Sequence, residues 1–119
     1  MVKKSNAGFT LVEIMVVVAV IAIILAIAIP NFLGSSEKSR RTICIANLTK
    51  IDMAIDQWVL EENISPGTAI SESDADSICN NNIKGGRPKC PGGGVYVFHV
   101  VGVSPQITCS LEAKGHKLQ

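Results

Sequence analysis

The sequence lacks any marked excess of one charge. Its 119 residues carry 11 Lys and Arg against 10 Asp and Glu, which gives a formal net charge of +1. A chain this balanced generates no field that would attract nucleic acid, so we expect no nucleic-acid partner. The one basic cluster, Lys38 with Arg40 and Arg41, is short. It is interpreted as the distal end of a preceding apolar helix or as an exposed face.

The sequence also lacks the closely spaced ligands of common metal sites. No two of its cysteines or histidines form a C-x₂₋₄-C or H-x₃₋₅-H pair, which structural zinc favours. The residues weighed for zinc are Cys79, Cys90, His99, Cys109 and His116. The acidic residues Glu72, Asp74 and Asp76 are weighed for calcium. They lack EF-hand spacing and are interpreted as a solvated helix start, which the helix dipole favours, with calcium binding as the alternative. The spacing predicts no metal and no cofactor.

Catalytic machinery is missing as well. A cysteine nucleophile paired with His99 or His116 would need a third group to orient the base and donors for an oxyanion. No such arrangement is found in the sequence. We therefore do not expect an enzyme.

What the sequence does contain is one long apolar run near its N-terminus. Sixteen uninterrupted apolar residues extend from Ile14 to Ile29, and counted from Phe9 the stretch is twenty-one residues long. As an α-helix it would be roughly 30 Å long, the thickness of the hydrocarbon core of a bilayer. Apolar side chains occur on all sides of this helix, so it is not an amphipathic core helix. Pro30 is expected to end or kink it.

Two targeting interpretations of this run compete at first. A secretory signal peptide would be cleaved at a small-x-small site such as Ala26–Ala28, but the run exceeds the usual length of about 7–15 residues. In the other interpretation the helix stays in the membrane and the basic tract before it stays cytoplasmic.

Glu13 separates these interpretations. A charge in mid-membrane costs about 2.5–3.5 kcal/mol, so this carboxylate is expected to have a partner. A cut between Gly8 and Phe9 would create an α-amine one helical turn from Glu13. That amine would pair with Glu13 of the same chain or of a neighbouring subunit.

The segment Gly8–Glu13 reads GFTLVE and lies between a short basic leader and the apolar run. It resembles the cleavage and methylation segment of type IV prepilins and type II secretion pseudopilins. The resemblance implies that residues 1–8 are a leader, cleaved after Gly8 by a prepilin peptidase that also methylates Phe9. It implies that residues 9–30 span the inner membrane once and that Glu13 guides docking into a filament. The implied partners are related pilin subunits, an inner-membrane assembly platform and lipid. An uncleaved anchor and a signal peptide are the alternatives.

Residues 31–65 are predicted to be the amphipathic second half of the same N-terminal helix. One face carries residues at spacings of four and three: Cys44, Leu48, Ile51, Ile55 and Trp58. Pro66 and Gly67 should stop the helix. The stripe predicts packing against the chain's own head, with a coiled-coil seam as the alternative.

Residues 66–119 are predicted to form a small head, which makes the chain a pilin-like α+β protein with an antiparallel sheet. A capping box at Ser73 and Asp76 predicts a short helix over 74–81. Residues rich in β-branched and aromatic side chains predict strands over 95–103 and 106–110, joined as a hairpin, and a third short strand over 115–118.

Four cysteines behind a targeting segment indicate an oxidising compartment. A hairpin would bring Cys90 and Cys109 together, so we predict a disulfide between them. Closing that twenty-residue loop would contribute about 3 kcal/mol in the chain-entropy model. Cys44 and Cys79 would then pair with each other or stay buried thiols, because four cysteines allow three connectivities.

Taken together, the resemblance implies a structural subunit of a type II secretion pseudopilus or of a related type IV pilus-like filament, with its head in the periplasm. Twitching and DNA-uptake filaments share this subunit plan. The alternative is a membrane-anchored periplasmic binding module that has no filament role.

Overall fold

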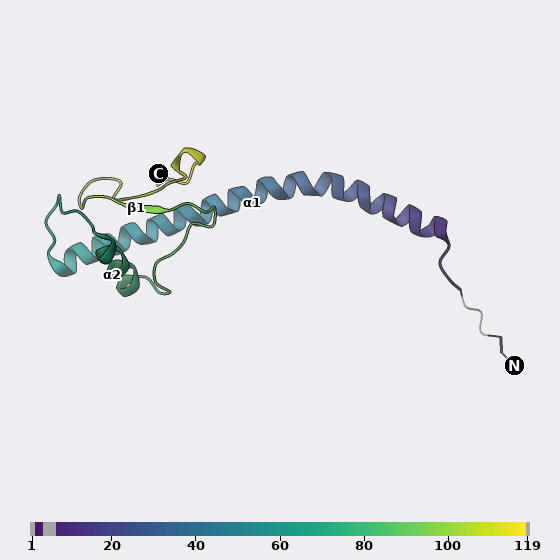
Figure 1. Ribbon diagram of the computed structural model, residues 1–119, viewed down its shortest axis with the longest axis horizontal. Helices are drawn as coiled ribbons and strands as arrows, with labels where there is room; N and C mark the ends of the chain where they lie inside the picture. Colours follow the sequence, from purple (N-terminus) through teal and green to yellow (C-terminus); the bar gives the residue numbers. More distant parts are fainter. Residues whose placement is uncertain (1, 4–6, 119) are drawn as a thin grey trace. The chain divides into compact units, whose positions relative to one another are not determined.

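The computed structural model describes residues 2–3 and 7–118, so the predicted leader is described only in part. The chain divides into two compact units, Met1–Ser36 and Glu37–Gln119, here called unit 1 and unit 2. The elements in chain order are α1 (Leu11–Glu62), α2 (Glu72–Asn82), β1 (Tyr96–Phe98), β2 (Ile107–Cys109) and the 3₁₀ helix η1 (Glu112–Lys114) (Figure 1). This composition confirms the predicted pilin-like α+β class.

Helix α1 begins at Leu11 because Thr10 caps it. The hydroxyl of Thr10 accepts a hydrogen bond of 3.2 Å from the backbone N–H of Glu13, which satisfies one of the unpaired amides of the first turn. The helix does not end at Pro30, although a proline removes one backbone hydrogen bond. The helix continues on both sides of Pro30. The side-chain amide of Asn31 donates a hydrogen bond of 3.3 Å to the carbonyl of Ile27. A single helix therefore covers both predicted halves.

The core of unit 2 is built on the face of α1 that the spacing predicted. Cys44, Leu48, Ile51 and Ile55 are fully buried, and Trp58 packs against them at the edge. Figure 1 shows α2 and the hairpin beside this part of α1. They supply the other core residues, which include Ile78, Cys79, Tyr96, Ile107 and Cys109.

Helix α2 forms as predicted but begins earlier, at Glu72. The pattern Ser-x-x-Asp occurs twice in the sequence, starting at Ser71 and at Ser73. The first copy caps the helix, so the N-cap is Ser71 and not the predicted Ser73. The side chain of Ser71 accepts from the backbone N–H of Asp74, and the Asp74 carboxylate accepts in return from the backbone N–H of Ser71. The Ser71 hydroxyl also donates to the Asp74 carboxylate at 2.5 Å, and this bond, with the one from the Ser71 backbone N–H, holds the pKa of Asp74 below its usual value.

The antiparallel hairpin is confirmed, with Tyr96 opposite Cys109 and Phe98 opposite Ile107, but its strands are shorter than predicted. Beyond β1, Val100 forms an isolated bridge with Ala69, which lies ahead of α2, while the backbone N–H of His99 still donates to the carbonyl of Gln106 across the hairpin. The predicted third strand over 115–118 is wrong. The chain there turns through η1 and a left-handed Gly115, whose φ of 88° interrupts extended backbone.

Candidate functional site

The predicted cleavage site lies in an open segment of unit 1. Residues 7–10 are neither helix nor strand, and a methyl group added at Gly8 would meet no atom within 4 Å. The next side chain, Phe9, is 81% exposed. A protease needs access to backbone outside regular secondary structure, and the Gly8–Phe9 bond is exposed and lies outside any helix or strand.

Glu13 occupies the first turn of α1 and is exposed. Its backbone is tied to Thr10, and its charge lies at the helix N-terminus, where a carboxylate is stabilised by about 0.3–1 kcal/mol. The sequence interpretation missed this cap, although the Thr-x-x-Glu spacing signals it. It also assumed a helix that includes Phe9, whereas α1 of the uncleaved chain begins only at Leu11.

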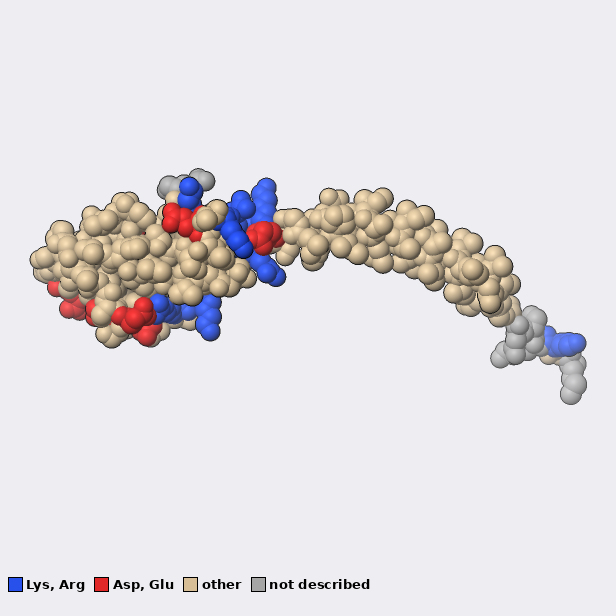
Figure 2. Space-filling model, turned by 45° about the horizontal axis from the view of Figure 1, so that its top comes forward, with Lys and Arg blue, Asp and Glu red and all other residues tan. Residues whose placement is uncertain are grey.

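Within the described residues of unit 1, the apolar part of α1 is exposed along its length. Every large apolar residue from Leu11 to Leu33 is at least 48% exposed. On the face drawn in Figure 2 this helical part of unit 1 carries no blue or red side chain (Figure 2). Its length and composition suit one membrane crossing. Burial of a single Val, Leu or Ile side chain is worth about 1.5–3 kcal/mol, so this surface requires lipid or other helices around it.

In unit 2, four side chains from separate segments meet in the core. They come from α1, from the loop before β1, from the end of β2 and from the residues after η1: Cys44, Cys90, Cys109 and His116. All four are buried, and their sulfur and nitrogen atoms lie within 4.8 Å of one another. This group is called the Cys₃His cluster below.

The cluster contains both cysteines of the predicted Cys90–Cys109 disulfide. The hairpin does bring Cys90 and Cys109 together, and they are free thiols there, as are Cys44 and Cys79. Cys79 is buried on α2 and does not belong to the cluster. The absence of local C-x₂₋₄-C spacing carries no information about this group, because its members are far apart in the sequence and the fold assembles them.

The thiols of the cluster interact with one another and with the backbone. Burial, reinforced by hydrogen bonding to Cys90, raises the pKa of Cys44 to about 12. Burial acts on Cys90 too, but hydrogen bonds from Cys44 and from the backbone amides of Gly94 and Gly92 outweigh it and lower the pKa of Cys90. The Tyr96 hydroxyl donates to the Cys44 sulfur at 3.6 Å. Of these two thiols, Cys90 is therefore the more easily deprotonated.

His116 is fully buried, and only one of its two ring nitrogens has a hydrogen-bond partner among the described residues. Its Nδ1 lies 3.5 Å from the sulfur of Cys90, while its Nε2 has no hydrogen-bond partner among the described residues. Among the described residues, the nearest carboxylate oxygen to Nε2 is Oε1 of Glu37, at 3.9 Å. A buried polar atom left unpaired costs about 1–3 kcal/mol, so this arrangement calls for an explanation.

Two glycines allow the chain to close around the cluster. A methyl group at Gly94 would lie 2.6 Å from the sulfur of Cys109, and one at Gly92 would lie 2.9 Å from Cε1 of His116. Any side chain at either position would push a cluster member away. This close approach of the backbone to the cluster is a finding of the structure.

The other side chains weighed for chemistry have structural partners. Arg87 binds the carboxylates of Glu72 and Asp76 at 2.9 Å each, in agreement with the interpretation of a helix start. Nε2 of His99 lies 2.8 Å from the hydroxyl of Thr108 on the neighbouring strand. These residues therefore serve the fold of unit 2.

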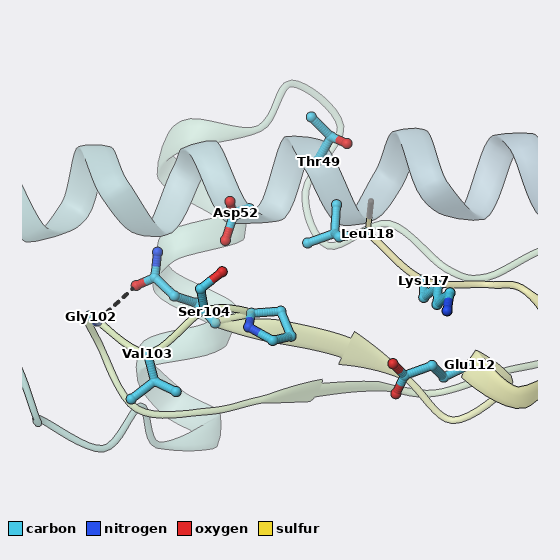
Figure 3. Close-up of a pocket in the computed structure, with 10 residues that line it drawn as sticks. Thr49, Asp52, Gly102, Val103, Ser104, Glu112, Lys117 and Leu118 are labelled. Carbon is cyan, nitrogen blue, oxygen red and sulfur yellow. Dashed lines mark hydrogen bonds between the residues drawn. The ribbon is translucent and has the colours of Figure 1, made fainter.

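An open hollow of about 630 Å³ lies in unit 2 between α1 and the turn of the hairpin. Figure 3 shows Asp52 on the α1 side and Glu112 and Lys117 on the C-terminal side (Figure 3). Gln106 links the two sides: its Oε1 accepts from the backbone N–H of Gly102, and its Nε2 donates to Asp56 at 2.8 Å. The charged groups of this hollow are one lysine and two carboxylates.

The raised pKa of Asp52 leads to a testable prediction about the free energy of unfolding. Burial, with the nearby charge of Asp56, raises the pKa of its carboxyl, so the folded state binds this proton more tightly than the unfolded chain does. The charged form therefore destabilises the fold at neutral pH, and the penalty disappears as the pH falls below the unfolded pKa. We expect Asp52→Asn to raise the free energy of unfolding at pH 7 by less than about 1 kcal/mol, and to change it little at pH 3. Thermal unfolding at both pH values measures this, and a loss of stability at pH 7 would contradict it.

Comparison with known proteins gives a consistent picture. The family model described as the prokaryotic N-terminal methylation motif matches residues 3–29. The type II secretion system core protein G of Klebsiella pneumoniae is 30% identical over 103 residues, which cover 78% of this chain and 74% of that protein. The protein of that name from Aeromonas hydrophila is 29% identical over 97 residues, which cover 82% of this chain and 66% of the relative.

A third relative of the same name, from Pectobacterium carotovorum subsp. carotovorum, is 34% identical over 61 residues, 51% of this chain and 39% of its own length. The chain thus spans about two fifths to two thirds of the length of several of these relatives. No solved structure matches it. The matched motif contains the Gly8–Glu13 segment and the apolar run, and the longer alignments continue into unit 2.

Proposed function

The chain belongs to the family of type II secretion system core protein G, and we propose from this membership that it is a structural subunit of a type II secretion pseudopilus. The observation that carries the proposal is the uncovered apolar stretch of α1 directly behind an accessible Gly8–Phe9 bond. Its activity is assembly, and its relatives are named as secretion-system proteins, not as enzymes.

The first step is removal of the leader. A membrane prepilin peptidase cuts after Gly8, whose missing side chain leaves the bond unobstructed, and the same enzyme methylates the new amine of Phe9. The basic leader holds the N-terminus on the cytoplasmic side, as positive residues beside a membrane helix do. The head is then periplasmic, and the chain crosses the inner membrane once.

The second step uses the charge that the cut creates. The freed amine of Phe9 is a cation close to the lone carboxylate at the start of α1, Glu13. In a low-dielectric environment two such charges attract strongly, and each relieves the cost of burying the other. When the pair forms between neighbouring subunits, it fixes how far one helix is displaced along the next.

The third step exchanges lipid for protein. In the membrane the exposed apolar side chains of α1 are covered by acyl chains. In a filament the same side chains are covered by the helices of other subunits. An assembly platform can therefore move each subunit from the membrane into the filament while this surface stays away from water. Unit 2 remains outside the helical core as the head.

The alternative of a membrane-anchored periplasmic binding module is not favoured, because the relatives carry the name of a secretion-system core component. The hollow beside Asp52 is the only argument for it that we find among the described residues.

Mass spectrometry of the mature N-terminus tests the proposal. The chain is expressed with a prepilin peptidase and purified from membranes, and we expect a polypeptide that begins with N-methylated Phe9. Gly8→Val provides the matched variant: its branched side chain obstructs the bond, and we expect at least tenfold less cleavage. A mature chain that retains residues 1–8 in the presence of active peptidase would contradict the proposal and leave a simple anchor.

A further inference from the structure

We propose that unit 2 binds one structural zinc ion through the four side chains of the Cys₃His cluster: Cys44, Cys90, Cys109 and His116. This inference does not depend on the proposed function, since it concerns the core of the head alone. It reverses the expectation of no metal, which depended on sequence spacing.

The dimensions of the cluster suit this ion. Zinc in structural sites is tetrahedral, with Zn–S distances of about 2.3 Å and Zn–N distances of about 2.0–2.1 Å, so its ligand atoms lie roughly 3.5–3.8 Å apart. Here the sulfur of Cys90 and Nδ1 of His116 are 3.5 Å apart, and all four ligand atoms fall within 4.8 Å of one another. Slight inward rotation of the side chains completes the tetrahedron. Soft thiolates with one imidazole, closed to solvent, favour zinc over calcium or magnesium.

The charges can be balanced within the core. Binding releases three thiol protons to solvent, which leaves Zn²⁺ with three thiolates and a neutral imidazole, a net charge of −1. The backbone amides of Gly92 and Gly94 already donate to the sulfur of Cys90. The guanidinium of Arg41 lies beside Gly115, so close that a methyl group there would come within 3.0 Å of its Nε. The two amide donors offset part of the buried negative charge, and Arg41 lies on the exposed side next to Gly115.

A metal at Nδ1 also accounts for the other nitrogen of His116. With Nδ1 occupied, the proton resides on Nε2, which faces Oε1 of Glu37 at 3.9 Å. Histidines that bind metals usually donate their second N–H to a carboxylate or carbonyl, which fixes the ring and raises its basicity. The unpaired, fully buried Nε2 is therefore the atom that Glu37 would satisfy in the loaded site.

The site would add a further link between parts of the head that already meet in a small apolar core. The sheet of unit 2 has two strands of three residues each, which is little for an independent fold. Zinc would join α1, the loop before β1, the end of β2 and the C-terminal segment at one point. Small domains commonly gain stability in this way, because binding free energy becomes folding free energy.

The rival is the disulfide between Cys90 and Cys109, which an oxidising compartment favours. This disulfide would use two of the four ligands. Cys44 and His116 would then pack against the disulfide and could not bind zinc. The two states differ in zinc content and in thiol count, so one sample distinguishes them.

The test uses the full chain, purified in detergent without chelator. We expect about one zinc per chain by elemental analysis and four thiols titratable after denaturation with EDTA. A zinc-free protein with two titratable thiols would overturn the proposal in favour of the disulfide. A zinc-free protein with four thiols that also fails to take up added Zn²⁺ would overturn it outright.

Matched variants separate the site from the rest of the core. Cys109→Ser and His116→Gln should each retain less than a tenth of the zinc, whereas the controls Cys79→Ser and His99→Gln should retain all of it. Glu37→Gln should weaken zinc binding 10–100-fold with unchanged stoichiometry. Equal zinc in Cys109→Ser and Cys79→Ser would contradict the assignment.

A measurement on the unmodified chain covers the case in which the ligand variants do not fold. Replacing zinc with Co²⁺ should give intense tetrahedral d–d bands in the visible and thiolate-to-cobalt charge-transfer bands in the near ultraviolet. Added Zn²⁺ should remove both. A chain that takes up no cobalt, or that shows only weak octahedral bands, would overturn the proposal.

Discussion

Replacement of Glu13 by glutamine is expected to abolish filament assembly while the chain remains inserted in the membrane. Glutamine keeps the size of the side chain and leaves the hydrogen bond from the backbone N–H to Thr10 in place, so α1 should still begin at Leu11. Only the negative charge is removed. We expect at least a 100-fold loss of sheared filaments by immunoblot, with unchanged or improved insertion measured by carbonate extraction.

The two expected effects of this substitution have opposite signs because the carboxylate has opposite roles in the two environments. A charge near the membrane costs up to about 2.5–3.5 kcal/mol on insertion, and its removal relieves that cost. In the filament the same charge meets the amine of Phe9 inside an apolar bundle. Removing one partner there leaves the other buried and unpaired, which costs about 3–5 kcal/mol for each subunit interface.

The control is Glu62→Gln, at the far end of the same helix and outside the apolar run. It removes the same charge from an exposed position and should assemble normally. If Glu13→Gln also assembled normally, Glu13 would be only a residue of the helix N-terminus, favoured by the dipole. A loss of both insertion and assembly would indicate instead that the variant is not produced in a stable form.

The parts of the fold that depend on local patterns could be predicted from the sequence. The apolar run defines a helix by length and composition, and the stripe at Cys44, Leu48, Ile51 and Ile55 defines its buried face, because helical periodicity repeats within a few residues. The hairpin follows from turn residues between two β-branched segments. The Gly8–Glu13 segment has a fixed order of residue types, which made the family recognisable.

What could not be predicted depends on contacts between distant segments. The bridge of Val100 is one example, because its partner Ala69 precedes it by about thirty residues. The path of residues 115–118 is set by the positive φ of Gly115, and no hydropathy pattern encodes it. The Cys₃His cluster is the clearest case, since its four members become neighbours only when α1, the hairpin and the C-terminal segment have packed. Spacing rules for metal sites describe single loops and do not apply to it.

Truncation of Leu48 to alanine should have the largest effect on the stability of the head. Leu48 is fully buried on α1, in contact with the core that α2 and the hairpin complete. Removal of a buried leucine side chain costs about 2–5 kcal/mol, because apolar area is lost and a cavity remains. For a unit of this size each kcal/mol lowers the Tm by about 4–8 °C, so a decrease of more than about 10 °C is expected.

Leu60→Ala is the matched control, because it makes the same substitution in the same helix at a side chain that is 79% exposed. It should change the Tm by less than about 3 °C, since alanine is at least as good a helix former as leucine.

The fluorescence of Trp58, the only tryptophan of the chain, reports on unit 2 even when the rest of α1 stays helical in detergent. Both variants are measured at saturating Zn²⁺, because a ligand that binds only the folded state would otherwise shift the midpoint by itself. Equal midpoints for the two variants would show that the head is not held together by the face of α1 that Leu48 shares with Ile51 and Ile55.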